Sequence, residues 1–323
     1  MINAKELQPK WELLEKLPKL GDYDLIRIST VCLPDLSLAI SPDEERCLIL
    51  ELPAGFHFDF HPVVREKLSL DKNEEKNYVT VILYDNDYVD LFDHLITSIH
   101  NTIMNVRDTD EYSDIFAKTF HKWVKFFDLD NNNKLPDSVI IGMFGELILM
   151  KKLLNEAEGA KVNTILRGWK GPYDKGQDFE FDSINIEVKT RKPSPTSVKI
   201  ANEGQLDQLE GKELELAVVV VEQDPLNGMT LNQLICLLVD IIERLLGDTS
   251  ILYSAISQKG LWPKNLSDYD HISLVPKELT RYNCLSISFP RIVRSELVEA
   301  IFGVKYSLDT SKLNDHIIEQ VKL

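Results

Sequence analysis

Hydrophobic and polar positions alternate in short runs along the first ninety residues, as in YDLIRISTVCL, LSLAISP, RCLILELP and YVTVILYD. Alternation over a few residues is typical of strands that are buried on one face. Pro, Asp and Asn separate these runs, as expected for the turns between strands. The pattern therefore predicts a β-rich N-terminal domain over residues 1–90.

The hydrophobic period becomes helical after residue 87. DLFDHLITSIHNTIM and DIFAKTFHKWVKFF repeat their apolar positions every three or four residues, which predicts two helices in a connector over residues 91–130. The next segment, DLDNNNKLPD, concentrates Asn, Asp and Pro, so we expect a linker there. The remaining residues, 131–323, are predicted to form a second domain with a C-terminal extension.

The second domain is predicted to begin with the helix SVIIGMFGELILMKKLLNE, capped by Asp137 or Ser138. A hairpin at about residues 177–190 follows. ELAVVVVEQ is apolar enough for the buried centre of a sheet, and MTLNQLICLLVDIIERLL has the period of a helix. This order predicts an α/β core. For the remainder we expect one or two strands around LSISFPRIV, a short helix near RSELVEAIFG and a polar C-terminal helix.

Length and composition point to a globular protein of two domains, or of one domain with elaborations. The chain has 323 residues, of which 44% are hydrophobic, and no segment approaches the ~18 uncharged apolar residues of a membrane span. No secretory signal is visible at the N-terminus, so we expect a cytoplasmic protein without a membrane partner. Four cysteines lie in apolar runs without metal-ligand spacing, and we expect buried free thiols: Cys32, Cys47, Cys236 and Cys284.

The charge of the chain limits how it can bind nucleic acid. A net charge of −16 argues against a protein that grips nucleic acid over its whole surface, because phosphates are neutralised by Lys and Arg. Residues 161–200 are the exception, with eight Lys and Arg against five Asp and Glu. Any contact with nucleic acid is therefore expected to be local or assisted.

Inside this basic stretch, the hairpin GQDFEFDSINIEVKT places Asp178, Glu187 and Lys189 on one face. A two-residue turn at 182–183 would pair Asp178 with Glu187, whereas a four-residue turn would pair Asp178 with Lys189 and Glu180 with Glu187. Directly opposed Cβ atoms lie about 4.5 to 5.5 Å apart. Two carboxylates at that distance repel each other unless a cation lies between them, which favours a divalent metal.

Glu187 and Lys189 point the same way on their strand, so that one can hold Mg²⁺ while the other orients an attacking water. Glu146 is the single charge in VIIGMFGELILM and is costly there unless a metal or Lys189 partners it. Gly142 and Gly145 would let the helix approach a neighbouring element closely. The alternatives are an exposed strand face with a cross-strand ion pair, and a Glu146 on the helix surface beside two lysines.

Glu146 on a helix, followed by Asp178 and then by Glu187-Val188-Lys189, resembles the active-site pattern of the PD-(D/E)XK nuclease superfamily. More narrowly, the chain resembles the bacterial "PD-(D/E)XK motif protein" family, which is encoded near restriction and phage-defence genes. The segments that carry this narrower resemblance occur in the family's order: GMFGEL, RGWKGP, QDFEF, IEVKT and GQLDQL. The resemblance covers roughly residues 135–215. One departure is that the nearby proline is Pro172, and no proline directly precedes Asp178.

The resemblance implies an α/β fold with a restriction-endonuclease-like core, in which a mixed central sheet is flanked by helices. It also implies a Mg²⁺ site, with Mn²⁺ as a substitute. Gln205, or Gln208 as second choice, would be a catalytic residue on a helix after the hairpin. The implied catalytic residues are Glu146, Asp178, Glu187, Lys189 and Gln205. The implied metal ligands are Asp178, Glu187, Glu146 and a backbone carbonyl of Val188 or Ile186.

The function that follows from the resemblance is a Mg²⁺-dependent endodeoxyribonuclease in a restriction or antiviral defence system. Its partners would be DNA and other defence-system subunits, and a homodimer is attractive because double-strand cleavage commonly needs two active sites. One alternative is a non-catalytic DNA-binding or scaffold subunit that retains the nuclease fold. Another is an acidic mimic of DNA, motivated by net charge alone. Trp169 could stack on a base or anchor its loop.

Overall fold

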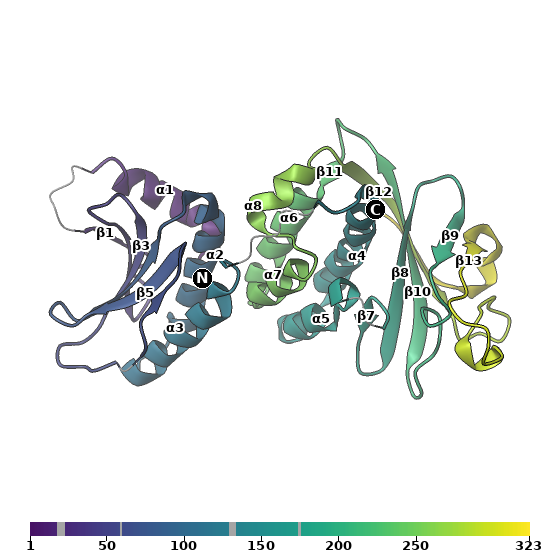
Figure 1. Cartoon of the computed structure of the whole chain (residues 1–323), viewed down its shortest axis with the longest axis horizontal. Coiled ribbons are helices and arrows are strands. Elements are labelled where there is room, and N and C mark those ends of the chain that lie inside the picture. Colours follow the sequence, from purple (N-terminus) through teal and green to yellow (C-terminus); the bar gives the residue numbers. More distant parts are fainter. Residues whose placement is uncertain (18–22, 59, 129–133, 174–175) are drawn as a thin grey trace. The chain divides into compact units, whose positions relative to one another are not determined.

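The alternating N-terminal segment folds into a six-stranded antiparallel sheet in the computed structural model, which describes residues 1–17, 23–58, 60–128, 134–173 and 176–323. The strand order is β1-β2-β3-β6-β5-β4 (Figure 1). The prediction of a β-rich N-terminal region is thus confirmed. The strand bounds are β1 Asp24–Arg27, β2 Asp35–Ile40, β3 Arg46–Glu51, β4 Val63–Val64, β5 Leu68–Asn73 and β6 Tyr78–Leu83.

Three helices accompany this sheet: α1 Ala4–Leu14, α2 Val89–Ile103 and α3 Thr109–Val124. The helical period predicts α2 and α3, but α1 was not expected. It begins with a capping box between Asn3 and Glu6 and buries Leu7, Trp11 and Leu14. All three helices belong to the first compact unit, Met1–Asn132 with Trp262–Lys264. Half of the predicted linker DLDNNNKLPD, residues 129–133, lies outside the described residues.

A mixed sheet forms the second unit, which comprises Asn133–Leu261 and Asn265–Leu323. Its strand order is β11-β12-β10-β8-β7, and β14 pairs with β12. β10 pairs with β8 in parallel, whereas the other ladders of this sheet are antiparallel. The bounds are β7 Phe179–Glu180, β8 Ile184–Arg191, β10 Glu213–Gln223, β11 Met229–Thr230, β12 Ser273–Asn283 and β14 Ile317–Lys322.

Helices cover one face of this sheet, and a two-stranded sheet lies on the other side of β8 and β10 (Figure 1). The small sheet pairs β9 Ser197–Ile200 with β13 Tyr306–Asp309. A core beneath it joins side chains of β9 and β13 to Leu214, Leu216 and Val218 of β10. The helix bounds are α4 Asp137–Glu156, α5 Val162–Gly168, α6 Leu231–Arg244 and α7 Thr249–Ser257. A further short helix, α8 Pro263–Leu266, has residues in both units. The predicted α/β class is therefore confirmed.

α4 packs closely on β8 because it has a glycine at the contact. A Cβ added to Gly145 would lie 1.9 Å from Thr190 Oγ1, as expected from its predicted role in close approach. A Cβ added to Gly142 would meet nothing within 4 Å, so that the same expectation is wrong for Gly142. The N-cap of α4 is Pro136, and no side chain caps it, in contrast to the predicted cap at Asp137 or Ser138.

Several C-terminal predictions are wrong. The polar C-terminal segment is strand β14, because pairing with β12 satisfies its backbone. LSISFPRIV contains no strand, and RSELVEAIFG contains only the 3₁₀ turn Arg294–Glu296. GQLDQL forms a turn in place of the implied helix.

Cys236 is exposed, whereas Cys32, Cys47 and Cys284 are buried free thiols as expected. Within the described residues, no helix is long and apolar enough to cross a membrane.

Candidate active site

The register of the β7–β8 hairpin is the first determinant of the site. Phe179 pairs with Ile186, and the Phe181 N–H donates to the Ile184 carbonyl at 2.9 Å. This is the register of the two-residue turn, so the four-residue alternative is wrong. Its continuation places Asp178 opposite Glu187, as that register predicts.

Asp178 lies directly before β7 and contacts β8 through its side chain. Its Oδ2 accepts the Val188 N–H at 2.7 Å, while its backbone carbonyl accepts the N–H groups of Lys170 at 2.7 Å and Gly171 at 3.1 Å. The N–H and C=O of one strand residue point to the same edge of the strand. The Val188 carbonyl therefore faces the edge at which the Asp178 carboxylate lies.

Glu187 is buried on the opposite sheet face from α4. It pairs in register with Leu216, and Lys189 pairs with Val218, so both lie on the face of the small-sheet core. Glu187 is only 1% exposed, and its Oε1 accepts a hydrogen bond from Lys189 Nζ at 2.6 Å. Burial, together with repulsion from Asp178, raises the pKa of Glu187 to about 8, although Lys189 opposes the shift.

Glu146 reaches the site from α4. Its Oε2 accepts the indole N–H of Trp169 at 2.7 Å, a hydrogen-bond donor that sequence patterns do not suggest beside the expected metal or Lys189. Burial raises the pKa of Glu146 well above its usual range, and the Asp178 and Glu187 carboxylates raise it further. Trp169 and Lys189 act in the opposite direction. Glu146 is thus a member of the carboxylate cluster rather than a solvated helix residue.

The segment 169–171 connects Glu146 to Asp178. Trp169 is 1% exposed and forms a β-bridge with Phe179, so it anchors the loop and is not available to stack on a base. A Cβ added to Gly171 would lie 2.1 Å from Glu146 Oε2 and 3.1 Å from Asp178 Oδ1. The two carboxylate oxygens therefore flank the same point, and a side chain at this position would collide with the Glu146 oxygen and crowd the Asp178 oxygen. No pattern in the sequence points to this role of Gly171.

The chemistry of the donor set fits a hard divalent cation. Three carboxylates, those of Glu146, Asp178 and Glu187, interact with one another, and Lys189 is the cation that opposes their repulsion. When ionised, three carboxylates and one ammonium leave two negative charges, and carboxylate and carbonyl oxygens are the ligands that Mg²⁺ prefers. Within the described residues, no group of three or more His, Cys, Asp or Glu side chains already has the arrangement of a metal site.

The side-chain hydrogen bond of Gln205 does not connect it to the carboxylate cluster. Its Oε1 accepts the Ala201 N–H at 2.7 Å within the turn formed by GQLDQL. A residue that the sequence did not single out, Gln177, is buried beside Asp178. Its Nε2 donates to the carbonyls of Gly204 at 3.1 Å and Asp207 at 3.3 Å. Gln177 therefore holds this turn beside the hairpin.

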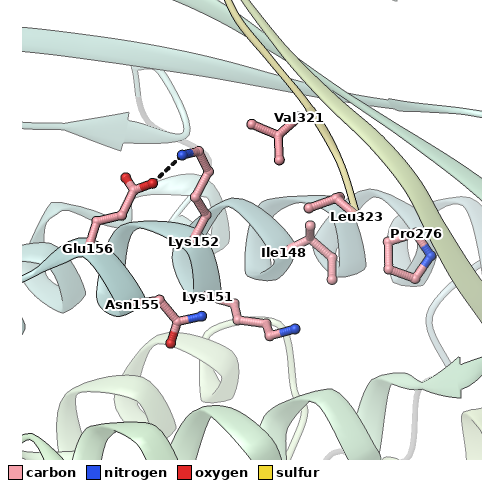
Figure 2. Close-up of a pocket in the computed structure, with 8 residues that line it drawn as sticks. All are labelled: Ile148, Lys151, Lys152, Asn155, Glu156, Pro276, Val321 and Leu323. Atoms are coloured by element: carbon pink, nitrogen blue, oxygen red, sulfur yellow. Dashed lines mark hydrogen bonds and ion pairs between the residues drawn. The ribbon is translucent and has the colours of Figure 1, made fainter.

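A separate pocket of about 290 Å³ lies along α4 (Figure 2). Lys152 crosses one side of it and pairs with Glu156 and, at 2.6 Å, with Glu319. Its lining contains none of the predicted site residues and consists of Ile148, Lys151, Lys152, Asn155, Glu156, Pro276, Val321 and Leu323. The carboxylate cluster is therefore distinct from this pocket.

Comparison with known proteins gives one family. The family described as "Putative PD-(D/E)XK family member, (DUF4420)" matches residues 7–311. The match extends well beyond residues 135–215, where the sequence motifs lie. No curated protein and no solved structure matches the chain significantly.

Proposed function

Because the chain belongs to the PD-(D/E)XK family DUF4420 and has a nuclease fold, we propose that it is a metal-dependent endonuclease that hydrolyses DNA phosphodiester bonds. The observation that carries the proposal is the convergence of Glu146 from α4, Asp178 from directly before β7, and Glu187 with Lys189 from β8. Three carboxylates and an ammonium are the groups that such hydrolysis uses.

Asp178, Glu187 and Glu146 would hold Mg²⁺, with the Val188 carbonyl as a further oxygen donor. When bound, the ion stabilises negative charge on the phosphate and lowers the pKa of a bound water. Mn²⁺ has similar ligand preferences and would substitute.

The chain's own groups have separate tasks in this proposal. Lys189, whose ammonium is held 2.6 Å from Glu187 Oε1, would orient the attacking water by donating to its oxygen. Trp169 would keep Glu146 turned toward Asp178. Gln205 enters only as part of the turn held by Gln177, since its own side-chain oxygen accepts the Ala201 N–H.

The biological setting is also proposed. The resemblance to the motif-protein family supports a role in restriction or antiviral defence, in the cytoplasm and beside other subunits. The net charge of −16 supports assistance by a partner, because the chain lacks the excess of Lys and Arg that would neutralise many phosphates. Two copies of the site in a homodimer would allow both DNA strands to be cut.

The test is nicking of supercoiled plasmid by the purified protein in Mg²⁺, in Mn²⁺ and in EDTA. We expect metal-dependent nicking that falls at least a hundredfold in Glu187→Ala and in Lys189→Ala. Lys192→Ala, an exposed lysine just after β8, is the matched control and should keep wild-type activity. Equal nicking by all four proteins would reject the proposed site, and nicking that persists in EDTA would reject the metal.

A further inference from the structure

Two amide side chains are buried beside the proposed metal ligands. Gln177 is 4% exposed and directly precedes Asp178, and Asn185 is 2% exposed on β8, two residues before Glu187. Burial of an amide group costs free energy unless its polar atoms have hydrogen-bond partners. Two buried amides at one place therefore need a connected set of partners.

The hydrogen bonds of the two amides form one chain with a fixed direction. Gln177 Nε2 donates to the carbonyls of Gly204 at 3.1 Å and Asp207 at 3.3 Å, which can only accept. Its Oε1 must then face Asn185, whose Nδ2 donates to it at 2.9 Å. Asn185 Oδ1 in turn accepts the ammonium of Lys212 at 3.4 Å. The chain thus runs from a cation to two backbone carbonyls, and each amide takes one orientation.

Lys212 fixes the outer end of this amide chain to the hairpin. Its Nζ also donates to the Phe181 carbonyl at 2.7 Å, directly before the two-residue turn. Asn185 lies on the other strand of the hairpin, in register with Glu180. The amide chain therefore joins both arms of the hairpin to the GQLDQL turn.

Asp178 is the metal ligand next to this amide chain. It lies directly before β7, so that the strand ladder holds its backbone from the C-terminal side. On the N-terminal side its neighbour is Gln177, whose side chain the amide chain holds in place. Fixing Gln177 restricts the backbone dihedral angles that set the direction of the Asp178 carboxylate.

Stability alone does not require a polar pair at this place. Replacement of both partners of a buried hydrogen bond by apolar groups of the same shape can be nearly neutral or stabilising. A buried polar network whose members are satisfied instead rigidifies its surroundings and specifies one arrangement. A ligand that is already fixed in position binds with a smaller loss of conformational entropy. The amide pair is therefore better suited to fixing a ligand than to filling space.

We propose that Gln177 and Asn185 are positioning residues for the Asp178 carboxylate, and that together they raise the affinity of the proposed site for a divalent cation. This inference rests on the proposed nuclease function and deepens it, because it makes metal affinity depend on two residues that are not ligands. Both amides act through Asp178 and take no part in hydrolysis. The expected effect of losing either one is about tenfold in metal affinity, at the lower end of the range for contacts outside the ligand shell.

Calorimetric titration of the full chain with Mn²⁺ tests the proposal. Gln177→Met keeps an unbranched side chain but removes both donors, and Asn185→Leu removes the donor and the acceptor at similar volume. Each variant should bind Mn²⁺ about tenfold more weakly than the wild type. Thr310→Val is the matched control, because it removes another buried hydrogen bond of the second unit, from Thr310 Oγ1 to the Thr196 carbonyl at 2.6 Å. Its Mn²⁺ affinity should equal that of the wild type.

The double variant Gln177→Met, Asn185→Leu distinguishes one chain from two independent contacts. Either substitution alone breaks the chain, so the double variant should bind Mn²⁺ no more weakly than the single variants. Losses that multiply would overturn the single chain. Lys212→Met breaks the outer link without a buried substitution, and should weaken Mn²⁺ binding about threefold even if a buried substitution prevents folding.

Plasmid nicking adds a readout that a loss of stability would not produce. The amide variants keep all the proposed ligands and Lys189, so raising the Mn²⁺ concentration should return Gln177→Met and Asn185→Leu to the wild-type rate. The same increase should not restore Glu187→Ala, which lacks a ligand. Rates of the amide variants that stay low at saturating Mn²⁺ would show that the amides do not act through metal affinity.

Three further outcomes would overturn the inference. If Gln177→Met, Asn185→Leu and Lys212→Met all bind Mn²⁺ as tightly as the wild type, the amides only hold the GQLDQL turn, although the nuclease proposal stands. If Thr310→Val binds Mn²⁺ as weakly as the amide variants, loss of any buried hydrogen bond is sufficient. A wild type that neither binds Mn²⁺ nor nicks DNA would reject the nuclease proposal itself, and this inference with it.

Discussion

The indole N–H of Trp169 donates to Glu146 Oε2 over 2.7 Å and joins the end of α5 to the middle of α4. An indole can donate but cannot accept, so this contact fixes which way the carboxylate oxygen points. The neighbouring Gly171 leaves room for the Glu146 and Asp178 oxygens at the same point. Trp169 is therefore a positioning residue for the proposed metal ligand.

Replacement of Trp169 should lower the affinity for metal more than it lowers the free energy of unfolding. Trp169→Phe keeps a large apolar ring but removes the donor, and loss of such an outer contact typically costs 10- to 100-fold in metal affinity. Calorimetric titration with Mn²⁺ measures the affinity, and Trp123→Phe in the first unit is the control. Equal Mn²⁺ affinity in Trp169→Phe and wild type would show that the indole does not position Glu146.

Glu187 should make the metal-free protein less stable as the pH rises. Its pKa is raised from about 4.5 to about 8 in the folded state, chiefly by burial, so its stabilising contribution is complete below pH 4.5 and is lost as the pH rises through 8. Mg²⁺ competes with the proton for the Glu187 carboxylate, so its affinity should increase as the pH rises over the same range. The measurement is the unfolding temperature from pH 5 to 9 for wild type and Glu187→Gln, with and without Mg²⁺.

The result is the difference in unfolding temperature between the wild type and Glu187→Gln. Without metal, the wild type should lose stability relative to Glu187→Gln as the pH increases, and Mg²⁺ should restore stability to the wild type alone. Parallel curves for the two proteins would show that Glu187 titrates near its ordinary pKa.

A buried carboxyl group in the first unit should make the stability of that unit depend on pH. Asp93 is 1% exposed and accepts hydrogen bonds from Trp11 Nε1 at 2.8 Å and Gln8 Nε2 at 2.7 Å. Burial raises its pKa from 3.8 to about 6, although the Trp11 hydrogen bond opposes the shift. Its stabilising contribution is therefore complete below pH 3.8 and is lost as the pH rises through 6.

The corresponding test compares wild type with Asp93→Asn by urea unfolding between pH 4 and 7. The wild type should lose about 2 kcal/mol relative to the variant over this range, since each pKa unit corresponds to about 1.4 kcal/mol and part of the loss already occurs below pH 4. Asn keeps an oxygen that can accept the Trp11 N–H. A difference that is independent of pH would mean that Asp93 is ionised throughout.

The two glycines of α4 should respond oppositely to alanine. Gly145→Ala places a Cβ against Thr190 and should cost about 1 to 3 kcal/mol of stability, as overpacking does. Gly142→Ala meets nothing within 4 Å and should stabilise the helix by about 0.5 to 1 kcal/mol. The double variant Gly145→Ala, Thr190→Ala should recover part of the loss. Chemical unfolding measures all four proteins, and equal costs for the two glycines would contradict the close packing of α4 on β8.

Periodicity predicted the long elements well. α2, α3, α4 and α6 follow from repeats of three or four residues, and β10 follows from its apolar run, because each of these buries one face along most of its length. Sequence patterns leave the register of the hairpin open, since both turns keep the same residues on the same face. The structure selects the two-residue turn by the pairing of Phe179 with Ile186.

Long-range pairing explains the errors. Nothing local identifies residues 317–322 as a strand, because its backbone partners lie about forty residues earlier in β12. The turn at GQLDQL is likewise set by contacts from Gln177 and Arg291, whose side chain donates to the Leu206 carbonyl at 3.0 Å. Tertiary contacts of this kind override local helix propensity.

The sequence by itself determined the α/β class and the order of the main elements, and it singled out the charged residues Glu146, Asp178, Glu187 and Lys189 that are proposed as the site. It could do so because hydrophobic periods and isolated charges in apolar segments are local properties of a chain. Only the tertiary structure decided that Trp169 and Gly171 lie against those carboxylates. Hydrogen bonds and close contacts between distant segments depend on how whole elements pack, and no local pattern in the sequence encodes them.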